Sequence, residues 1–337
     1  MSWSGQFVKR PKEEWAMEQY DVTALGELLI DFTENGTSCQ GNPLLEANPG
    51  GAPCNVLAML NKLGKKTAFI GKIGDDMFGS QLEAALQETG IDTRGLKRDA
   101  GVNTTLAFVH TKDDGDREFS FYRKPGADMM LAEEDLEEEL LKNCKIFHFG
   151  TLSMTHEACR KATQKAIAIA KESGALLSFD PNLREPLWED LEEARTCMYY
   201  GMQYCDILKI SDNEIQWLTG EDDFDAGVAV LREKFHIPLI LLSMGRDGSR
   251  AYVNGLRVES PAFVQEHTIE TTGAGDTFCA CILNYVLEHG CQDFDESSLR
   301  EMLRFANMAA ALVTTRKGAL RVMPEKEEIE TALAESK

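Results

Sequence analysis

The sequence predicts an α/β protein in which a mostly parallel β-sheet is covered by helices on both faces. Short apolar runs of strand length alternate along the chain with stretches in which apolar residues recur at helical spacing. Glycines follow several of the helical stretches, as expected at helix C-termini. The chain has 337 residues, of which 43% are hydrophobic, so it can bury a large core as one domain or as two unequal parts.

The first units of this sheet follow one another closely. Residues 22–32 predict a buried strand, and residues 53–63 a helix with its apolar residues on one face. A strand over residues 67–71 and an amphipathic helix over about 78–89 come next, and both helices end at a glycine.

The same alternation continues after residue 140. Apolar runs predict strands over residues 145–150, 175–180, 205–210 and 237–244. Helical patterns pass through residues 166–173 and 213–220 between them.

Two regions depart from this rhythm and predict a small β lid from about residues 33–49 and 101–125. Two alternating strands flank the polar turn at residues 112–116, which is typical of a hairpin, and residues 33–48 are polar with few helix formers. A second hairpin is expected over residues 251–258, turned by Asn254-Gly255.

The expected domain organisation is simple. We expect an N-terminal extension over residues 1–20, a main domain over residues 21–330 that carries the lid, and a C-terminal tail over residues 331–337. The extension is either a flexible arm or sequence upstream of a start at Met17.

Composition excludes several classes of partner. The 56 acidic residues exceed the 35 basic ones, and a formal charge of −21 repels nucleic acid and anionic membrane surfaces. The nine cysteines include no C-x-x-C pair, which argues against a disulfide framework and a structural zinc site. No apolar run reaches the length of a membrane span, and the N-terminus does not resemble a signal peptide. We therefore expect a cytoplasmic protein.

The most informative stretch is the glycine-rich turn at residues 271–278, TTGAGDTF, which opens an apolar helix. Free backbone amides at such a helix start bind anions, and Asp276 would stand at the mouth of that site. A carboxylate in this place suits a base that takes a proton from a hydroxyl attacking a phosphate, although Asp is also a common helix N-cap. Neither a G-x-x-x-x-G-K-[ST] loop nor a G-x-G-x-x-G fingerprint occurs, which disfavours P-loop enzymes and Rossmann dehydrogenases.

Two long signatures carry a family resemblance. Residues 48–55 (NPGGAPCN) are followed by residues 70–79 (IGKIGDDMFG), and residues 272–276 (TGAGD) form the second signature. From about Val22 to Pro324 the chain resembles the ribokinase-like, or phosphofructokinase-B, family of carbohydrate kinases. Within that family it is most similar to fructokinases, on residues 26–32, 121–123, 180–184 and 314–319.

The resemblance implies a three-layer α/β/α fold and a set of catalytic and sugar-binding residues. It makes Asp276 the base and the backbone of Gly273, Ala274 and Gly275 the anion hole. The sugar-binding set it implies is Asp31, Gly50, Gly51, Asn55, Phe108, Arg123 and Arg184, with Phe108 covering the apolar face of the sugar. Asp75 and Asp76 are expected to form a turn and a helix cap rather than to bind ligands.

The resemblance also implies nucleotide and cation sites. The nucleotide set is Ser211, Glu214, Ser243, Gly245, Gly248, Gly273, Gly275 and Asn307, with Asn307 near the adenine and Glu214 near the water shell of Mg²⁺. The polar group of Asn307 could instead be satisfied by a neighbouring backbone group. A potassium site is expected at Glu270, Thr272, Val313, Arg316 and Gly318, although the family usually has Asp where this chain has Glu270.

The expected reaction is transfer of the γ-phosphoryl group of MgATP to the primary hydroxyl of a small free sugar, with fructose the first candidate. Kinases for 2-keto-3-deoxygluconate, ribose or a nucleoside remain open, and Arg123 and Arg184 could serve the acidic first of these. A non-catalytic sugar-responsive regulator on the same fold is the alternative from another class. The lid is expected to close over the sugar and could also pair two subunits as a homodimer.

Overall fold

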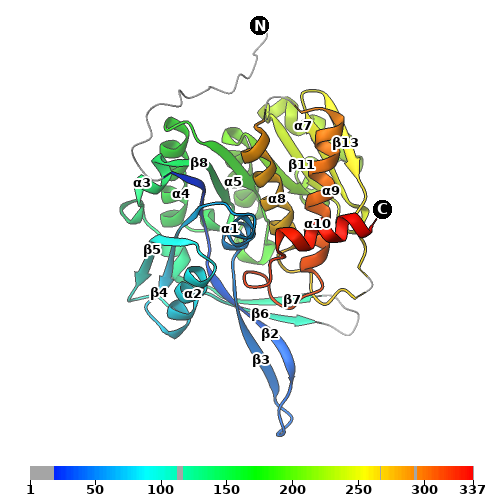
Figure 1. Cartoon of the computed structure of the whole chain (residues 1–337). Coiled ribbons are helices and arrows are strands. Elements are labelled where there is room, and N and C mark those ends of the chain that lie inside the picture. The colour runs from blue at the N-terminus through cyan, green and yellow to red at the C-terminus, as the bar shows by residue number, and fades with distance from the viewer. Residues whose placement is uncertain (1–18, 112–116, 266, 292–293, 337) are drawn as a thin grey trace.

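A nine-stranded sheet lies at the centre of the molecule, with the strand order β13-β12-β11-β10-β9-β8-β1-β4-β5 (Figure 1). The computed structural model describes residues 19–111, 117–265, 267–291 and 294–336. The strands of this sheet are β1 (Tyr20–Leu25), β4 (Thr67–Gly74), β5 (Asp92–Asp99), β8 (Cys144–Gly150), β9 (Leu176–Asp180), β10 (Ile207–Ser211), β11 (Leu239–Ser243), β12 (Ser249–Val253) and β13 (Leu256–Ser260). Neighbours pair in parallel from β5 to β11, and β12 and β13 extend that edge as an antiparallel hairpin.

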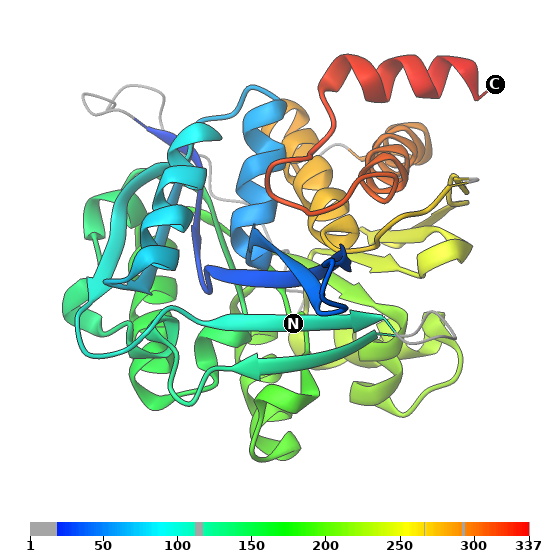
Figure 2. The same ribbon diagram turned by 90° about the horizontal axis from the view of Figure 1, so that it is seen from below.

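Helices cover both faces of the sheet, as Figure 2 shows from below, and each face has its own buried apolar cluster. One face packs against α1 (Ala52–Lys62), α2 (Met77–Glu88), α8 (Ala274–His289), α9 (Glu296–Val313) and α10 (Lys326–Glu335). The other packs against α3 (Glu138–Lys142), α4 (Glu157–Glu172), α5 (Leu191–Tyr204), α6 (Asp212–Thr219) and α7 (Phe224–Phe235). The predicted three-layer α/β/α class is therefore confirmed.

A second, four-stranded sheet forms the predicted lid. Its order is β3-β2-β6-β7, with β2 (Leu29–Thr37), β3 (Pro43–Gly50), β6 (Leu106–Thr111) and β7 (Arg117–Tyr122). The β2–β3 hairpin projects from one end of the molecule in Figure 1. Strands β6 and β7 pair antiparallel as expected, whereas the predicted turn at residues 112–116 lies outside the described residues.

The structure corrects the prediction of one strand over residues 22–32. The chain leaves the large sheet after Leu25, where the Gly26 N–H donates to the Ile70 carbonyl at 3.2 Å, and it enters the lid at Leu29. Both segments are buried at the break, so the apolar pattern gives no sign that the chain changes sheets. Strand β5 was missed because its sequence, DTRGLKRD, is mostly polar.

The structure also shows the C-terminal segment, the predicted helix cap and one of the predicted turns. Helix α10 runs through residues 331–335, so the proposed C-terminal tail is largely helical. Asp76 caps α2 by accepting from the Gly79 N–H at 2.8 Å, as predicted. Asn254 and Gly255 both have positive φ, which is the conformation of the predicted hairpin turn. In the described part of the chain, no helix is long and apolar enough to span a bilayer.

Candidate active site

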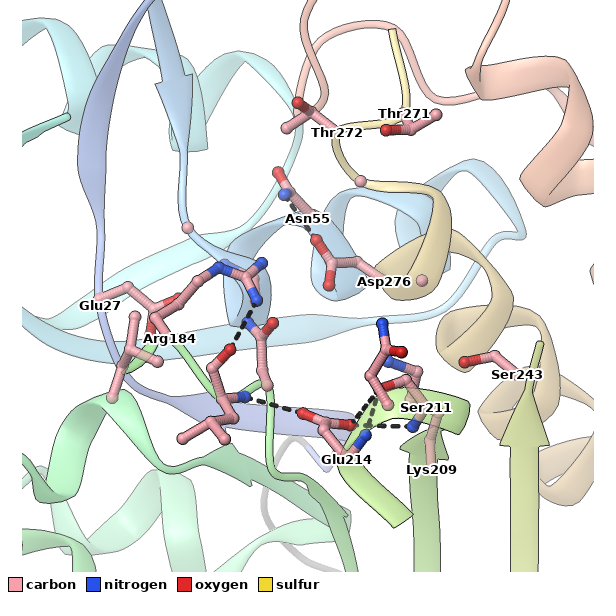
Figure 3. A pocket seen from close by; sticks show the side chains of 18 of the residues that line it. Glu27, Asn55, Arg184, Lys209, Ser211, Glu214, Ser243, Thr271, Thr272 and Asp276 are labelled. Carbon is pink, nitrogen blue, oxygen red and sulfur yellow. Dashed lines mark hydrogen bonds between the residues drawn. The ribbon is translucent and has the colours of Figure 1, made fainter. Parts of the chain in front are cut away.

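A cavity of about 650 Å³ lies between the lid and the residues that follow β9, β10 and β11 (Figure 3). Ligands bind beyond the carboxyl ends of parallel strands because loops and helix N-termini meet there. Most of the predicted site residues line this cavity: Asp31, Gly51, Asn55, Arg184, Ser211, Glu214, Ser243, Gly245, Thr272, Gly273, Gly275 and Asp276. Two segments far apart in the sequence, residues 27–55 and 271–276, thus meet at one site.

Asp276 lies in the first turn of α8, at the wall of the cavity. Its Oδ2 atom accepts a hydrogen bond from Nδ2 of Asn55 at 2.8 Å, which fixes the carboxylate (Figure 3). Burial raises the pKa of Asp276 to about 6, while the hydrogen bond from Asn55 acts in the opposite direction. Such a carboxylate is ionised at neutral pH and still basic enough to accept a proton from a hydroxyl.

The loop before α8 supplies free amides beside this carboxylate. Gly273 has a φ of 79°, a conformation that favours glycine, and it caps the helix without a side chain. The Ala274 N–H donates to the Thr271 carbonyl at 3.3 Å, so the predicted anion-hole role of Ala274 is weakened. In the structure as described, the amides of Gly275 and Asp276 have no protein acceptor and can bind an anion.

The other end of the cavity is acidic and closely packed. Asp31 extends from β2 into the cavity, and burial, followed by the charge of Glu270, raises its pKa to about 7. A Cβ atom on Gly50 would lie 2.3 Å from Oδ2 of Asp31, so Gly50 allows Asp31 to occupy its place. Gly51 has a φ of 126°, and a Cβ atom there would lie 2.4 Å from the Glu27 carbonyl oxygen. The two glycines therefore shape the cavity wall through their lack of side chains.

Asn55 offers a second polar atom to a ligand. Its Nδ2 atom donates to Asp276, whereas its buried Oδ1 atom has no hydrogen-bond partner among the described residues. A buried acceptor without a partner is costly unless a ligand or water satisfies it. A sugar hydroxyl that donates to Asn55 Oδ1 would satisfy this atom.

Glu27 is a cavity residue to which the sequence analysis assigned no role. Its Oε1 atom accepts from the Ala52 N–H, the first amide of α1, at 2.8 Å. Burial raises the pKa of Glu27 to about 7. The side chain therefore fixes the segment that carries Gly51 and adds a further carboxylate to the cavity lining.

Lys209 is a second cavity residue that the sequence analysis missed. It lies in β10 with 9% of its side chain exposed, and its Nζ atom is 3.0 Å from Oδ2 of Asp180 at the end of β9. A lysine within the apolar run ILKIS needs a partner when that run is a buried strand. That mismatch is the sequence signal that could have indicated Lys209.

The structure corrects the role predicted for Arg123. Its guanidinium pairs with Asp128 at 2.7 Å and also donates to Thr155 Oγ1 and to the Leu152 carbonyl. Both side chains of the pair are only 2% exposed, and Arg123 is not among the residues that line the cavity. Arg123 therefore supports the wall from behind, whereas Arg184 lines the cavity and is exposed. A contact from Arg184 to the sugar stays a prediction.

The role predicted for Phe108 is also wrong, because this ring lies on the opposite face of the lid from the cavity. Successive side chains of a strand point to opposite faces, and Phe108 pairs in register with Phe32, onto which it stacks at 4.9 Å. Its neighbour Val109 lines the cavity, as does Phe121 on β7. Contact of Phe121 with the apolar face of a sugar is a prediction that replaces the one made for Phe108.

A second cavity of about 590 Å³ continues from the first and shares with it Ser243, Gly245, Thr271 and Gly275. Its remaining lining is mostly apolar and includes Phe263 and Phe278. A Cβ atom on Gly248, which has a φ of 99°, would lie 2.2 Å from the Ser260 carbonyl oxygen, so this turn requires glycine. Among the predicted nucleotide residues, Ser243, Gly245, Gly248, Gly275 and Asn307 line this cavity.

Asn307 lines the second cavity, but its amide is already satisfied within the protein. Its Oδ1 atom accepts from Ser249 Oγ at 2.9 Å, and its Nδ2 atom donates to the carbonyls of Ser260 and Pro261. The sequence left open that a neighbouring backbone group satisfies the Asn307 amide, and the structure has this arrangement. Asn307 therefore joins α9 to the β12–β13 hairpin, and the adenine contact predicted for its amide is not supported.

Glu214 and Ser211 form a capping box at the start of α6. The Glu214 carboxylate accepts from the Ser211 N–H and hydroxyl, and from the Leu183 N–H at 2.8 Å. Glu214 thereby joins the loop after β9 to α6 while still lining the cavity. A contact from this carboxylate to the water shell of a magnesium ion stays a prediction.

The residues predicted for a monovalent cation lie in and beside the loop before α8. Glu270 accepts from Thr272 Oγ1 at 2.5 Å and from the Gly318 N–H at 3.1 Å. The Val313 carbonyl accepts from the Arg316 N–H at 3.1 Å. Among the described residues, no cluster of three or more His, Cys, Asp and Glu side chains is arranged to hold a metal ion. The Glu270 carboxylate therefore connects the loop before α8 directly to residue 318. Carboxylate, hydroxyl and carbonyl oxygens are the atom types that suit an alkali cation, and a potassium ion bound here stays a prediction.

Comparisons with known proteins agree with this geometry. Residues 19–326 match the pfkB family carbohydrate kinase description. The chain is 43% identical over 305 residues to probable fructokinase-2 of Arabidopsis thaliana, covering 90% of this chain and 92% of the relative. It is 42% identical over 310 residues to fructokinase-1 of Zea mays, covering 91% and 96%.

Solved structures share the fold over nearly the whole chain. A fructokinase from Xylella fastidiosa with bound ATP has a TM-score of 0.84 at 29% identity, covering 94% of this chain and 99% of its own. A putative ribokinase II from E. coli in complex with ATP and Mg²⁺ has a TM-score of 0.83 at 26% identity, covering 94% and 100%. A fructokinase double mutant from Vibrio cholerae with fructose, ADP and potassium has a TM-score of 0.82 at 28% identity, covering 94% and 100%. This chain belongs to the pfkB family of carbohydrate kinases.

Proposed function

We propose that this protein is an ATP-dependent fructokinase that transfers the γ-phosphoryl group of MgATP to O6 of fructose. The position of Asp276 carries the proposal: this carboxylate lines the acidic cavity next to Gly275, which also lines the second cavity. Relatives named fructokinase at 42–43% identity support the choice of sugar.

Different residues of this chain bind the sugar, accept the proton and stabilise the phosphoryl group. Asp31 and Asn55 Oδ1 accept hydrogen bonds from sugar hydroxyls and hold the ring against the wall formed by Gly51. Asp276 takes the proton of the attacking hydroxyl as the new P–O bond forms. The amides of Gly275 and Asp276 stabilise charge on the transferring phosphoryl group. Mg²⁺, when bound with ATP, neutralises phosphate charge, and Glu214 is the residue proposed to contact its water shell.

The charges at the sugar end favour a neutral substrate over an acidic one. Glu27, Asp31 and Asp276 line the cavity, whereas Arg123, which could have served a carboxylate, is paired with Asp128. Arg184 remains as a cation at the wall. A kinase for 2-keto-3-deoxygluconate would place a carboxylate among these acids, which like-charge repulsion opposes. Ribose and nucleosides remain alternatives that the screen below tests.

Three further parts of the proposal concern a cation, the oligomeric state and the location. Potassium at Glu270 and Thr272 is supported by the oxygen donors there and by the potassium-bound relative from Vibrio cholerae. Pairing of two subunits through the lid is supported by the exposed aromatic face of that sheet, where Tyr122 is 68% exposed next to Phe108. A cytoplasmic location stays a prediction from composition.

A coupled ADP-release assay tests the function. Fructose, ribose, 2-keto-3-deoxygluconate, adenosine and fructose 6-phosphate are compared as acceptors, and fructose is expected to give the highest kcat/KM. A higher value for another acceptor would replace fructose as the substrate. Calorimetric binding of fructose without ADP release from any acceptor would favour the non-catalytic regulator.

A further inference from the structure

We propose that Lys209 is a catalytic residue that contacts the transferring phosphoryl group, and that Asp180 holds it in position. This inference rests on the proposed kinase function. The alternative is that the pair is only a buried ion pair that joins β9 to β10.

The position of the Lys209 ammonium points to a ligand. A Cβ atom on Gly275 would lie 3.2 Å from Nζ, so the ammonium is next to the loop whose amides bind an anion. Figure 3 shows Lys209 at the same end of the cavity as Ser211 and Glu214. An anion held by the amides of Gly275 and Asp276 would therefore lie within reach of Nζ.

The hydrogen-bonding capacity of Lys209 is incompletely used. An ammonium group carries three donors. Within the described residues its one partner is Asp180, whose two oxygens lie at 3.0 and 3.3 Å from Nζ. Neighbouring carboxylates outweigh the desolvation that opposes the charged form, so the pKa of Lys209 is raised. Lys209 is therefore a cation during the reaction, and it has N–H donors available for a phosphate oxygen.

The other charges of the cavity explain why a cation is needed beside the phosphate groups. Glu27, Asp31, Glu214 and Asp276 line the cavity and would repel the phosphate groups of ATP. Lys209 is the buried cation on the described lining, since Arg184 is exposed. A cation fixed before the substrate arrives stabilises the charge that develops as the phosphoryl group moves.

The proposed step conserves atoms and charge. The bond between the γ-phosphorus and the ADP oxygen breaks, and a bond from the sugar oxygen to that phosphorus forms. The hydroxyl proton goes to Asp276, and Lys209 stays protonated throughout. Asp180 acts only by positioning Nζ.

Nucleotide binding tests the contact without reference to the sugar. Lys209→Met removes the charge and keeps the length of the side chain. Calorimetry with AMP-PNP and with ADP, both in Mg²⁺, measures how much the third phosphate adds to affinity. We expect Lys209→Met to reduce the AMP-PNP:ADP affinity ratio by about 10-fold or more relative to wild type. An unchanged ratio would overturn the proposal whichever sugar is the substrate.

Kinetics with the preferred acceptor of the ADP-release screen provide the second readout. We expect kcat to fall by about 10²–10³-fold in Lys209→Met with little change in sugar KM, and Lys209→Arg to recover part of the loss. Asp180→Asn should lower kcat less and keep the AMP-PNP:ADP ratio. A folded Lys209→Met protein with kcat within about threefold of wild type would leave only the structural role.

Two further variants protect the test from loss of folding. Lys142→Met removes an exposed lysine paired with Glu138 and should change neither readout. Should Lys209→Met not fold, Lys209→Gln keeps a donor for Asp180 and carries the same expectations. If the wild type uses an acceptor other than fructose, the proposed sugar is wrong, whereas the Lys209 prediction is still decided by the AMP-PNP:ADP ratio.

Discussion

Substitution of Asp276 by Asn should abolish activity and stabilise the protein at the same time. Asn keeps the shape of the side chain and can still accept the hydrogen bond from Asn55, but it cannot take a proton. Loss of a general base typically lowers rate by about 10²–10⁴-fold. Because the sugar and nucleotide contacts remain, their binding should change little.

The gain in stability follows from the pKa of Asp276. Burial raises this pKa from 3.8 to about 6, so the folded protein binds the proton more tightly than the unfolded chain does. Above pH 6 the ionised carboxylate therefore penalises the native state, by at most about 3 kcal/mol. The side chain borders an open cavity, so we expect roughly 1–2 kcal/mol and a Tm rise of roughly 2–4 °C at pH 8. The contribution of Asp276 to wild-type stability falls as pH rises from 4 to 6, and the gain in the variant should vanish below about pH 4.

The assay compares kcat, fructose affinity and Tm of wild type and Asp276→Asn at pH 8 and at pH 4. Asp222→Asn, an exposed carboxylate, is the matched control and should change none of these quantities. A kcat near the wild-type value would refute the base assignment. A lower Tm at pH 8, or a gain that persists at pH 4, would show that burial of the charge is not what raises the pKa.

Three other predictions test separate parts of the site. The kcat/KM of the wild type should fall about tenfold per pH unit below about pH 6, because protonated Asp276 cannot act as a base; a flat profile to pH 5 would contradict this. Phe121→Ala should raise sugar KM several-fold, whereas Tyr122→Ala, on the opposite face of the lid, should leave KM unchanged and weaken any lid-mediated dimer in sedimentation experiments. Potassium should activate the enzyme relative to tetramethylammonium at equal ionic strength, and equal rates would mean that the Glu270 hydrogen bonds to Thr272 and Gly318 suffice to hold the loop.

Local sequence patterns were enough to predict the parts of this protein that depend on neighbouring residues. Strand and helix periodicity gave the layered fold, and the glycine-rich turn gave the helix start that carries Asp276. The sequence could not show which side chains of a lid strand point toward the cavity. Phe108 and Val109 are adjacent, and only the pairing of β6 with β2 decides which of them faces the cavity.

The carboxylate partners of buried cations were the second feature that could not be predicted from the sequence. Arg123 and Lys209 are both buried cations that pair with a carboxylate of the described residues. The partner of Arg123 is five residues away, whereas that of Lys209 is on a different strand. Neither distance can be read from the chain without the fold. The pairing of Arg123 removes it from the cavity, whereas Lys209 remains on the cavity wall.

Asp276 separates two regions of opposite chemical character. On the sugar side, Asp31 and Glu27 have raised pKa values because burial disfavours their charge, and hydroxyl groups that donate to them would recover that cost. On the phosphoryl side, free amides and Lys209 favour negative charge. We propose that a neutral polyol is stabilised on one side of Asp276 and a phosphate on the other. In this proposal the asymmetry orients both substrates, so that the hydroxyl lies between the carboxylate that takes its proton and the phosphorus that it attacks.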